Sequence, residues 1–431
     1  MYFLYSALLA FALLLGSPYW IFEMLRHGKY RQGLRERLGF VPPRLRTGSK
    51  RSIWVHAVSV GEVLAVSELI RRLRGEYPEH RLVVSTTTDT GQKLAAGRFG
   101  AENVFYFPFD FKSSTERYFE VLRPDLIVVA ETEFWPNFLR VAKRRGARVA
   151  VVNARISDRS FLGYRRWRPL LARVLDNIDV FLAQTAEDVR RLTEIGAPAH
   201  KVFVGGNLKF DVPAPAAALI VSQLRSALTS SGAGPVLVGG STVEDEESLL
   251  LDAFKTVLDQ YPRAVLLLAP RHPERFEQVA SLLQKSGIPF TKRSEWKSEP
   301  LASGVLLIDS IGELASLYSL ADVAFVGGSL VPRGGHSILE PAQHGTAILV
   351  GPHTENFRDI VEMFRRNDAV RVVDQSELSS AIMNLLANGE ERHLLGRRAL
   401  DIFQSQRGAT ELALAKVREL LPASVREAHH V

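Results

Sequence analysis

Residues 51–74 read RSIWVHAVSVGEVLAVSELIRRLR, and this stretch decides the fold. Its first part, residues 53–58, is a short, mostly apolar run, which is typical of a strand buried on both faces of a sheet. Its second part, residues 63–74, has the length and apolar spacing of an amphipathic helix. A buried strand followed directly by a helix predicts the first step of an α/β fold with a parallel sheet.

The same alternation of apolar runs and helix-length segments continues along the chain. Further strands are predicted at 82–85, 104–107, 126–130, 149–152 and 180–183, with helices such as 134–145 and 164–176 between them. The stretch at 211–217 contains Pro213 and Pro215, which interrupt regular structure, and predicts a linker. The pattern then begins again, with strands at 236–238, 265–268, 305–308, 323–326 and 348–350 and helices such as 246–258 and 273–285.

A chain of 431 residues is too long for one ordinary core, so two domains are expected. The predicted fold class is α/β, with two Rossmann-like domains facing a central cleft and an N-terminal membrane anchor helix. Ligands of such domains bind at the carboxyl ends of the strands. The predicted order is a membrane anchor at 1–24, a basic juxtamembrane segment at 25–51, an N-terminal domain at 52–210, a linker at 211–218, a C-terminal domain at 219–421 and a tail at 422–431.

Composition excludes several classes of function. Hydrophobic residues make up 46% and charged residues 23% of the chain, which is typical of a globular protein. The chain has no cysteine, which excludes disulfides, thiolate metal sites and cysteine nucleophiles. The net charge is +7, and residues 24–51 alone hold nine Lys and Arg against Glu36. The excess is one patch without a nucleic-acid-binding motif, so no nucleic-acid partner is expected.

An apolar segment precedes the basic patch. Residues 1–22 hold no charged side chain, and a helix of that length would reach roughly 33 Å, enough to cross a hydrocarbon core of about 30 Å. Gly16, Ser17 and Pro18 interrupt it, so a kinked or half-inserted anchor is an alternative, as is a cleaved signal peptide. The Lys and Arg that follow place the downstream domains on the cytoplasmic side and would attract anionic headgroups.

Candidate chemical groups in the first half follow predicted strands. Glu62 ends the segment that begins at His56, where it could take a proton from a hydroxyl; its spacing from Ser59 also fits a plain helix cap. Glu131 and Glu133 follow the fourth strand and could hold a metal or simply favour a helix start, but no Asp-x-Asp element supports a metal, and none is expected. Lys209 follows a Gly-Gly turn and could neutralise a phosphate or sugar carboxylate, or be an ordinary surface lysine.

The second half offers groups suited to a nucleotide. The sequence GGST at 239–242 is predicted to open a helix that favours an anion, or to be a plain cap. Arg271 ends the next strand and could bind a phosphate with its guanidinium. A second glycine-rich loop and helix are predicted at 327–329 and 334–341, where Glu340 could accept from ribose hydroxyls or pair with His336. Several such loops on successive strand ends together predict a nucleotide site.

These motifs resemble the 3-deoxy-D-manno-octulosonic acid (Kdo) transferases of Gram-negative bacteria over nearly the whole chain. The most specific segments are 56–62, 131–137, 153–157, 206–211, 271–274 and 334–341. The resemblance implies a glycosyltransferase-B fold, CMP-Kdo as donor and lipid IVA, the tetraacylated lipid A precursor, as acceptor. It implies no cofactor, and it implies a place at the cytoplasmic face of the bacterial inner membrane, in lipopolysaccharide biosynthesis.

The resemblance also implies roles for particular residues. Glu62 would be the catalytic base of an inverting transfer, and Glu131 and Lys209 would support the transition state. The CMP site would be lined by Arg271, His272, Gly312, Glu313, Leu314, Ser337, Ile338, Leu339 and Glu340. The family is expected to carry asparagine where this chain has Ser337, which leaves the geometry of binding open at that position. Two alternatives remain beside the transferase: a nucleotide-sugar 2-epimerase on the same fold, and a membrane-attached, non-catalytic nucleotide-binding module.

Overall fold

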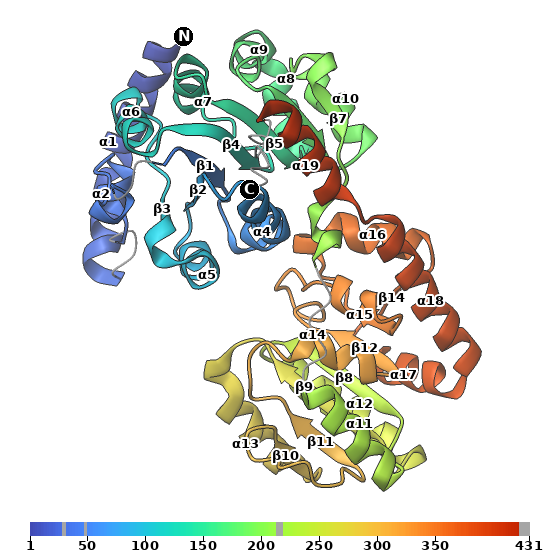
Figure 1. Cartoon of the computed structure of the whole chain (residues 1–431). Coiled ribbons are helices and arrows are strands. Elements are labelled where there is room, and N and C mark those ends of the chain that lie inside the picture. Colours follow the sequence, from blue (N-terminus) through green and yellow to red (C-terminus); the bar gives the residue numbers. More distant parts are fainter. Residues whose placement is uncertain (28–31, 47–49, 213–218, 422–431) are drawn as a thin grey trace, which may run out of the picture. The chain divides into compact units, whose positions relative to one another are not determined.

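The computed structural model describes residues 1–27, 32–46, 50–212 and 219–421, drawn in Figure 1. Contacts divide the chain into two compact units: unit 1 is Met1–Val212 with Gln406–Val431, and unit 2 is Pro213–Ser405. The predicted tail at 422–431 and residues 213–218 of the predicted linker lie outside the described residues. Each unit is built on its own sheet of seven strands.

Unit 1 contains a fully parallel sheet with the order β3-β2-β1-β4-β5-β6-β7. Its strands are β1 (Ser52–His56), β2 (Arg81–Thr86), β3 (Val104–Tyr106), β4 (Pro124–Ala130), β5 (Arg148–Ala154), β6 (Val180–Ala183) and β7 (Val202–Val204). Strand order reverses at β1, which pairs with β2 on one side and with β4 on the other. In an open α/β sheet, this reversal creates the crevice where ligands bind.

Helices cover both faces of this sheet (Figure 1). They are α3 (Val60–Ala65), α4 (Ser67–Glu76), α5 (Asp89–Phe99), α6 (Lys112–Leu122), α7 (Pro136–Arg144), α8 (Asp158–Arg166), α9 (Arg168–Leu175) and α10 (Ala186–Glu194), with short 3-10 turns η1 (Pro43–Leu45), η2 (Ala101–Asn103), η3 (Ala199–Lys201) and η4 (Leu208–Asp211). Alternate residues of β1 divide between two cores: Trp54 packs with Phe105 and Phe138, whereas Ile53 and Val55 face the core that includes α3 and α4. Burial on both faces explains the unbroken apolar runs.

The last helix, α19 (Ala409–Leu420), belongs to unit 1. It contacts α4, η4 and β5, and the Asp211 carboxylate accepts the backbone N–H groups of Gly408 and Thr410. The sequence predicts these residues in the C-terminal domain, and the difference has a physical reason. The apolar face of α19, including Ala413 and Leu414, is buried against unit 1.

Unit 2 repeats the architecture with the order β10-β11-β9-β8-β12-β13-β14, again parallel throughout. Its strands are β8 (Val236–Thr242), β9 (Val265–Pro270), β10 (Phe290–Lys292), β11 (Gly304–Leu307), β12 (Val323–Val326), β13 (Ala347–Val350) and β14 (Arg371–Val372). Its helices are α11 (Leu219–Ser231), α12 (Glu246–Gln260), α13 (Phe276–Ser286), α14 (Leu314–Leu317), α15 (Leu339–Gln343), α16 (Arg358–Arg366), α17 (Leu378–Ala387) and α18 (Gly389–Ser405), with η5 (Pro273–Arg275), η6 (Tyr318–Leu320) and η7 (Glu355–Phe357). The predicted fold class of two Rossmann-like α/β domains is confirmed.

An apolar helix, α1 (Tyr2–His27), precedes the sheet of unit 1 and is followed by the short α2 (Leu34–Arg37). Residues 2–24 are long and apolar enough to cross a membrane, by length and composition only. The predicted N-terminal apolar helix is therefore present, and Pro18 lies inside it without ending it.

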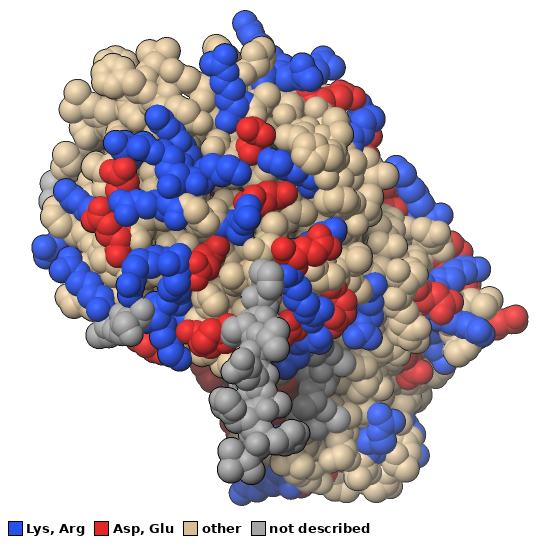
Figure 2. Space-filling view, turned by 45° about the horizontal axis from the view of Figure 1, so that its top comes forward, with Lys and Arg blue, Asp and Glu red and all other residues tan. Residues whose placement is uncertain are grey.

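Part of the basic segment after α1 binds back to unit 1. Arg37 donates to the Thr87 carbonyl and lies over the Tyr106 ring, at 4.6 Å from its centroid. Arg44 pairs with Glu36 at 2.6 Å. Figure 2 shows Lys and Arg side chains gathering over the upper part of its view, with Asp and Glu among them. These two arginines therefore have structural partners, which reduces the charge that the patch can offer to a membrane.

Candidate active site

The acidic residues of unit 1 lie where the strand order reverses. Glu62 follows β1 at the start of α3, and Glu131 and Glu133 follow the neighbouring strand β4. Burial raises the pKa of Glu62 to about 7, and the charges of Glu131 and Glu133 contribute to this rise. Burial also raises the pKa of Glu133. The structure thus brings Glu62 close to Glu131 and Glu133, which follow it in the sequence by 69 and 71 residues.

Glu62 also has the capping role that its spacing predicted as an alternative. Its carboxylate accepts the Val58 N–H at 2.8 Å and the Ser59 hydroxyl at 3.0 Å. The Ser59 side chain does not cap the helix in return, so the reciprocal capping box does not form. These two bonds favour the ionised form, but burial outweighs them. A carboxylate has about four acceptor positions, so the cap does not exhaust Glu62.

Backbone strain marks the ends of two adjacent strands. Glu131 after β4 has a φ of 57°, and Asn153 in β5 has a φ of 56°. Both angles lie in the left-handed region, which side-chain-bearing residues rarely adopt. The Glu131 N–H bonds to the Val152 carbonyl at 2.9 Å, which fixes this turn against β5. Strain of this kind concentrates at functional sites, where the surrounding structure holds it.

Lys209 lies in η4, and η4 packs against α3, the helix that carries Glu62. Asn153 holds this turn, because its Oδ1 accepts the Leu208 N–H at 3.0 Å. Asn207 continues the support, since its Oδ1 accepts the Lys209 N–H at 3.0 Å. All three groups predicted for catalysis, Glu62, Glu131 and Lys209, therefore follow strands or turns at the same edge of the unit 1 sheet.

Two supporting residues of this edge were not assigned a role from the sequence. His56 is completely buried, its Nδ1 lies 2.9 Å from the Ser85 hydroxyl, and its ring lies 4.0 Å from the Phe107 ring. Burial lowers its pKa to about 3, so the ring is neutral at physiological pH. Asn153 supports the η4 turn, and its sequence signal is a polar residue at the end of a buried strand.

In unit 2, Arg271 and His272 follow β9 and are exposed. Burial, and then the charges of Arg271 and His272, lower the pKa of His336 to about 4. Burial raises the pKa of Glu340, and Arg271 acts against this rise. The structure therefore brings Arg271 close enough to influence both His336 and Glu340, and His272 close enough to influence His336.

The other residues predicted to contact the nucleotide differ in how buried their side chains are and in which partners they bind. Gly312 has a φ of 93° and open space around its α-carbon, whereas Glu313 pairs with Arg293 at 3.2 Å and accepts from the Ser310 hydroxyl. Leu314 is half-buried at the start of α14. Ile338 and Leu339 are buried, so their side chains belong to the core. Ser337 is half-buried, and its hydroxyl lies 3.4 Å from the Leu339 N–H.

The predicted anion-binding helix start at residues 239–242 is wrong. These residues are the end of strand β8, and their glycines serve packing: a Cβ on Gly240 would lie 1.9 Å from the Tyr318 hydroxyl. In the glycine-rich loop and helix predicted at 334–341, the helix begins at Leu339, so Ser337 lies before it and does not share a helix face with Glu340. Gly334 and Gly335 have φ of 86° and 73°, in the left-handed region that favours glycine.

The backbone N–H groups of the glycine loop after β12 already bind a carboxylate of the same chain. Glu246, which is completely buried, accepts the backbone N–H groups of Gly328, Ser329 and Leu330 at 2.7, 2.9 and 2.9 Å. It also accepts the Val243 N–H at 3.1 Å. Three successive amides that converge on one carboxylate are not free to bind a phosphate, so Glu246 shapes this loop.

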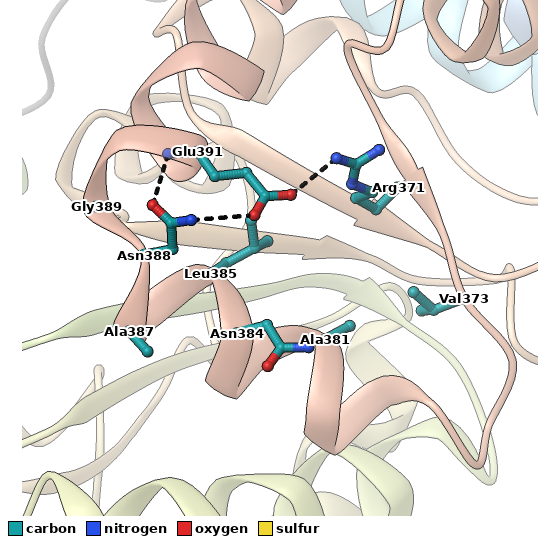
Figure 3. Close-up of a pocket in the computed structure, with 9 residues that line it drawn as sticks. All are labelled: Arg371, Val373, Ala381, Asn384, Leu385, Ala387, Asn388, Gly389 and Glu391. Carbon is teal, nitrogen blue, oxygen red and sulfur yellow. Dashed lines mark hydrogen bonds and ion pairs between the residues drawn. The ribbon is translucent and has the colours of Figure 1, made fainter.

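A surface pocket of about 650 Å³ lies apart from these residues, between β14, α17 and the start of α18 (Figure 3). Within it, Arg371 pairs with Glu391 at 2.8 Å, and Asn388 accepts the Glu391 N–H at 3.1 Å. None of the predicted site residues lines this pocket. Over the described ranges, no group of three or more His, Asp or Glu could hold a metal ion.

Comparison with known proteins gives consistent relatives. The sequence model of the family described as 3-deoxy-D-manno-octulosonic-acid transferase (kdotransferase) matches residues 32–212. A 3-deoxy-D-manno-octulosonic acid transferase of Haemophilus influenzae is 35% identical over 407 residues, which cover 92% of this chain and 93% of that protein. The transferase of the same name from Bordetella pertussis is 35% identical over 382 residues, which cover 86% and 87%.

A solved structure supports the fold. The crystal structure of UDP-GlcNAc 2-epimerase from Neisseria meningitidis bound to UDP-GlcNAc superposes with a TM-score of 0.54, covering 85% of this chain and 100% of that one. Its sequence identity is 13%, so the likeness concerns the architecture of the two sheets and not the reaction.

Proposed function

This chain belongs to the 3-deoxy-D-manno-octulosonic acid transferase family, and we propose that it transfers Kdo from CMP-Kdo to a lipid A precursor, lipid IVA. Members with this name are glycosyltransferases, and an enzyme of this class fits the strained, acidic edge of unit 1 better than a binding module does. The observation that carries the chemical part of the proposal is the pKa of Glu62, which burial raises to about 7. A general base works best when its pKa lies near the operating pH.

In the proposed reaction, Glu62 takes the proton from a sugar hydroxyl of the acceptor. The hydroxyl oxygen forms a bond to the anomeric carbon of Kdo while the bond from that carbon to the phosphate oxygen of CMP breaks. CMP leaves with the electron pair, and attack from the opposite face inverts the anomeric centre. Glu131 and Lys209 lie at the same sheet edge and would stabilise charge as it develops.

The nucleotide contacts are assigned to unit 2. Arg271 and His272 are exposed after β9, Arg271 carries the charge that suits a phosphate, and Glu340 is the acceptor suited to ribose hydroxyls. Because Arg293 and Ser310 already engage the Glu313 carboxylate, we expect Gly312, Glu313 and Leu314 to contact the nucleotide through their backbone. We expect the same of the buried Ile338 and Leu339, with Ser337 offering its hydroxyl. The proposal uses no metal or other cofactor.

The proposed location is the cytoplasmic face of the bacterial inner membrane. The apolar helix α1 fits membrane association. An amphiphilic acceptor such as lipid IVA is delivered in a membrane, so an enzyme held at the surface meets it there.

The test is incubation of the full chain with CMP-Kdo and lipid IVA, followed by measurement of CMP and by mass spectrometry of the lipid. We expect CMP release that depends on lipid IVA, and a lipid product heavier by one or more Kdo residues. CMP release at the same rate without lipid IVA would indicate a hydrolase and contradict the proposal. Conversion of UDP-GlcNAc without CMP-Kdo turnover would indicate the epimerase class instead.

A further inference from the structure

Helix α1 presents two different faces along its length. Its residues 2, 5, 6, 9, 13, 16, 17 and 20 are half-buried and recur every three or four positions, so they form one stripe of the helix, and its first residues contact the rest of unit 1. The opposite stripe is apolar and exposed, with Phe3, Leu4, Leu8, Phe11, Leu14 and Leu15 each at least 59% exposed. A face this apolar marks an interaction surface and not a water-facing one.

The first two turns of α1 are bound to unit 1 by polar contacts. The Asn137 side-chain amide donates to the Ser6 hydroxyl at 3.0 Å, and the Tyr5 hydroxyl bonds to the Asp110 carboxylate. The guanidinium of Arg140 lies over the Tyr2 ring, at 4.4 Å from its centroid. These partners belong to the folded body of unit 1, since Asn137 and Arg140 are in α7 and Asp110 precedes α6.

The partner site is rigid, because Asp110 is itself buried and fully engaged. Its carboxylate accepts the N–H groups of Asn137 and Phe138 at 2.9 and 2.7 Å, at the start of α7. The Tyr5 contact therefore joins α1 to a preformed helix terminus. This geometry favours one fixed position for the first turns of α1.

Because α1 is long, these contacts indicate how the helix is oriented relative to a membrane. A helix of 26 residues is roughly 39 Å long, longer than the hydrocarbon core of about 30 Å. If α1 crossed the bilayer, residues 2–6 would lie on one side of the hydrocarbon core, and the part of unit 1 from Gln32 onward would lie on the other side. Contacts of Tyr2, Tyr5 and Ser6 with α7 and Asp110 are incompatible with that arrangement.

We propose that α1 lies in the plane of the membrane surface, docked on unit 1 through Tyr5 and Ser6, with its outer apolar face immersed in one leaflet. The proposal uses only the membrane attachment of the proposed function and is independent of the reaction. It differs from the usual interfacial helix, whose polar face meets water, because here the folded domain covers that face.

The occupant of the outer face is a lipid leaflet with anionic headgroups. Exposed arginines lie on aromatic rings within and after α1: Arg26 lies over the Phe22 ring at 5.6 Å, and Arg35 and Arg117 lie over the exposed Phe40 ring at 5.7 and 5.8 Å. Arginines with their stems on aromatic rings suit the boundary between acyl chains and phosphates. An apolar stripe in a unit that also exposes such arginines therefore matches a membrane surface better than a water-soluble partner.

The absence of cysteine allows single labels to measure the depth of α1 directly. Leu4, Phe11, Leu15 and Phe22 would each be replaced by cysteine in the full chain and spin-labelled, with Leu13 as a control on the half-buried stripe. The protein would be bound to vesicles of phosphatidylethanolamine and phosphatidylglycerol, and accessibility to oxygen and to a water-soluble nickel complex would be measured.

We expect the four outer labels to share one shallow depth of roughly 5–10 Å, with the Leu13 label protected from both reagents. A profile that is deepest near position 11 and shallow at both ends would show a spanning helix and overturn the proposal. Labels that stay in water, or that couple magnetically to a second copy, would overturn the choice of a lipid leaflet. Neither result depends on transferase activity, so failure here is distinct from failure of the proposed function.

A pair of tyrosine variants tests the docking contact. Tyr5→Phe removes the hydroxyl that binds Asp110, whereas Tyr19→Phe removes a hydroxyl from the exposed stripe. We expect faster amide hydrogen exchange, by at least about 10-fold, in the first turns of α1 for Tyr5→Phe only. Equal exchange in both variants would contradict docking through Tyr5.

Discussion

The Glu62 carboxylate accepts the Val58 N–H at 2.8 Å, so the residue assigned as catalytic base also closes the start of its own helix. The two roles are compatible because the bond orients the carboxylate while burial, and the charges of Glu131 and Glu133, raise its pKa to about 7. An enzyme base must be held in place and must gain a proton near neutral pH. The capping bond serves the first need, and burial serves the second.

Glu62→Gln should lower turnover by at least ~10²-fold, because the amide cannot accept a proton from the acceptor. In the wild type, kcat/KM should rise with pH through about 7, since only the ionised carboxylate acts as a base. The measurement is the pH profile of CMP release with lipid IVA. Glu68→Gln is the matched control, because Glu68 pairs with Arg71 on α4. A variant at position 62 with a normal rate would remove Glu62 from the role.

The raised pKa of Glu62 also predicts how stability depends on pH. Catalysis needs the ionised carboxylate, whereas the folded state is stabilised by the protonated one. The folded state raises the pKa of Glu62 from 4.5 to about 7, so it holds the proton more tightly than the unfolded chain does. Stability from this group is present below pH 4.5 and is lost as pH rises through about 7. The melting temperature of Glu62→Gln, relative to wild type, should therefore be higher at pH 8 than at pH 5. A difference that is constant with pH would contradict the shifted pKa.

Asn153 should act as a positioning residue for Lys209. Asn153→Gly tolerates the φ of 56° but removes the acceptor of the Leu208 N–H, whose loss costs about 1–3 kcal/mol. We expect kcat to fall at least ~10-fold while KM for CMP-Kdo stays within about 2-fold, because the proposed nucleotide contacts belong to unit 2. Steady-state kinetics of this variant and of Asn367→Ala, an exposed asparagine in unit 2, would make the comparison. Unchanged kcat in Asn153→Gly would show that Lys209 needs no such support.

Glu246 should hold the loop after β12. Glu246→Gln places an amide N–H₂ against converging backbone donors and should lower the free energy of unfolding by at least about 2 kcal/mol. Urea unfolding would measure the change, with the exposed Glu244→Gln as the control. If both variants unfold at the same urea concentration, the loop does not depend on this carboxylate.

The sequence predicted the fold well because buried parallel strands are continuous apolar runs. Predicted strands such as 180–183 and 323–326 coincide with β6 and β12. Three strands were not predicted: β7, β10 and β14. Each has two or three residues and lies at the edge of its sheet, and so short an apolar run does not distinguish a strand from a loop. The helix predicted over 63–74 is interrupted at Val66, between α3 and α4.

The site was predictable only where chemistry follows a strand. Glu62 and Glu131 are predicted because strand ends at a switch point gather ligand groups, and the structure places both at such strand ends. The glycines at 239–240 were misinterpreted because their reason is the packing of Leu250 and Tyr318, which lie close only in the folded unit. Glu246 was missed because the three amides that it binds are more than 80 residues away in sequence.

A variant of Arg271 tests the proposed nucleotide site of unit 2 without a measurement of transferase activity. Arg271→Ala removes a positive charge near His336, so the His336 pKa should rise from about 4. It should stay below 6.5, because burial, the largest cause of the shift, remains. NMR titration of the histidine ring protons would measure this change. CMP affinity should fall roughly 10- to 100-fold in the same variant, as expected for loss of a charge-assisted contact of about 1.5–3 kcal/mol. Arg263→Ala, at the opposite end of β9, is the control for charge alone. A shifted His336 with unchanged CMP affinity would separate the two roles: Arg271 would be a neighbour of His336, and the phosphate would bind elsewhere in unit 2.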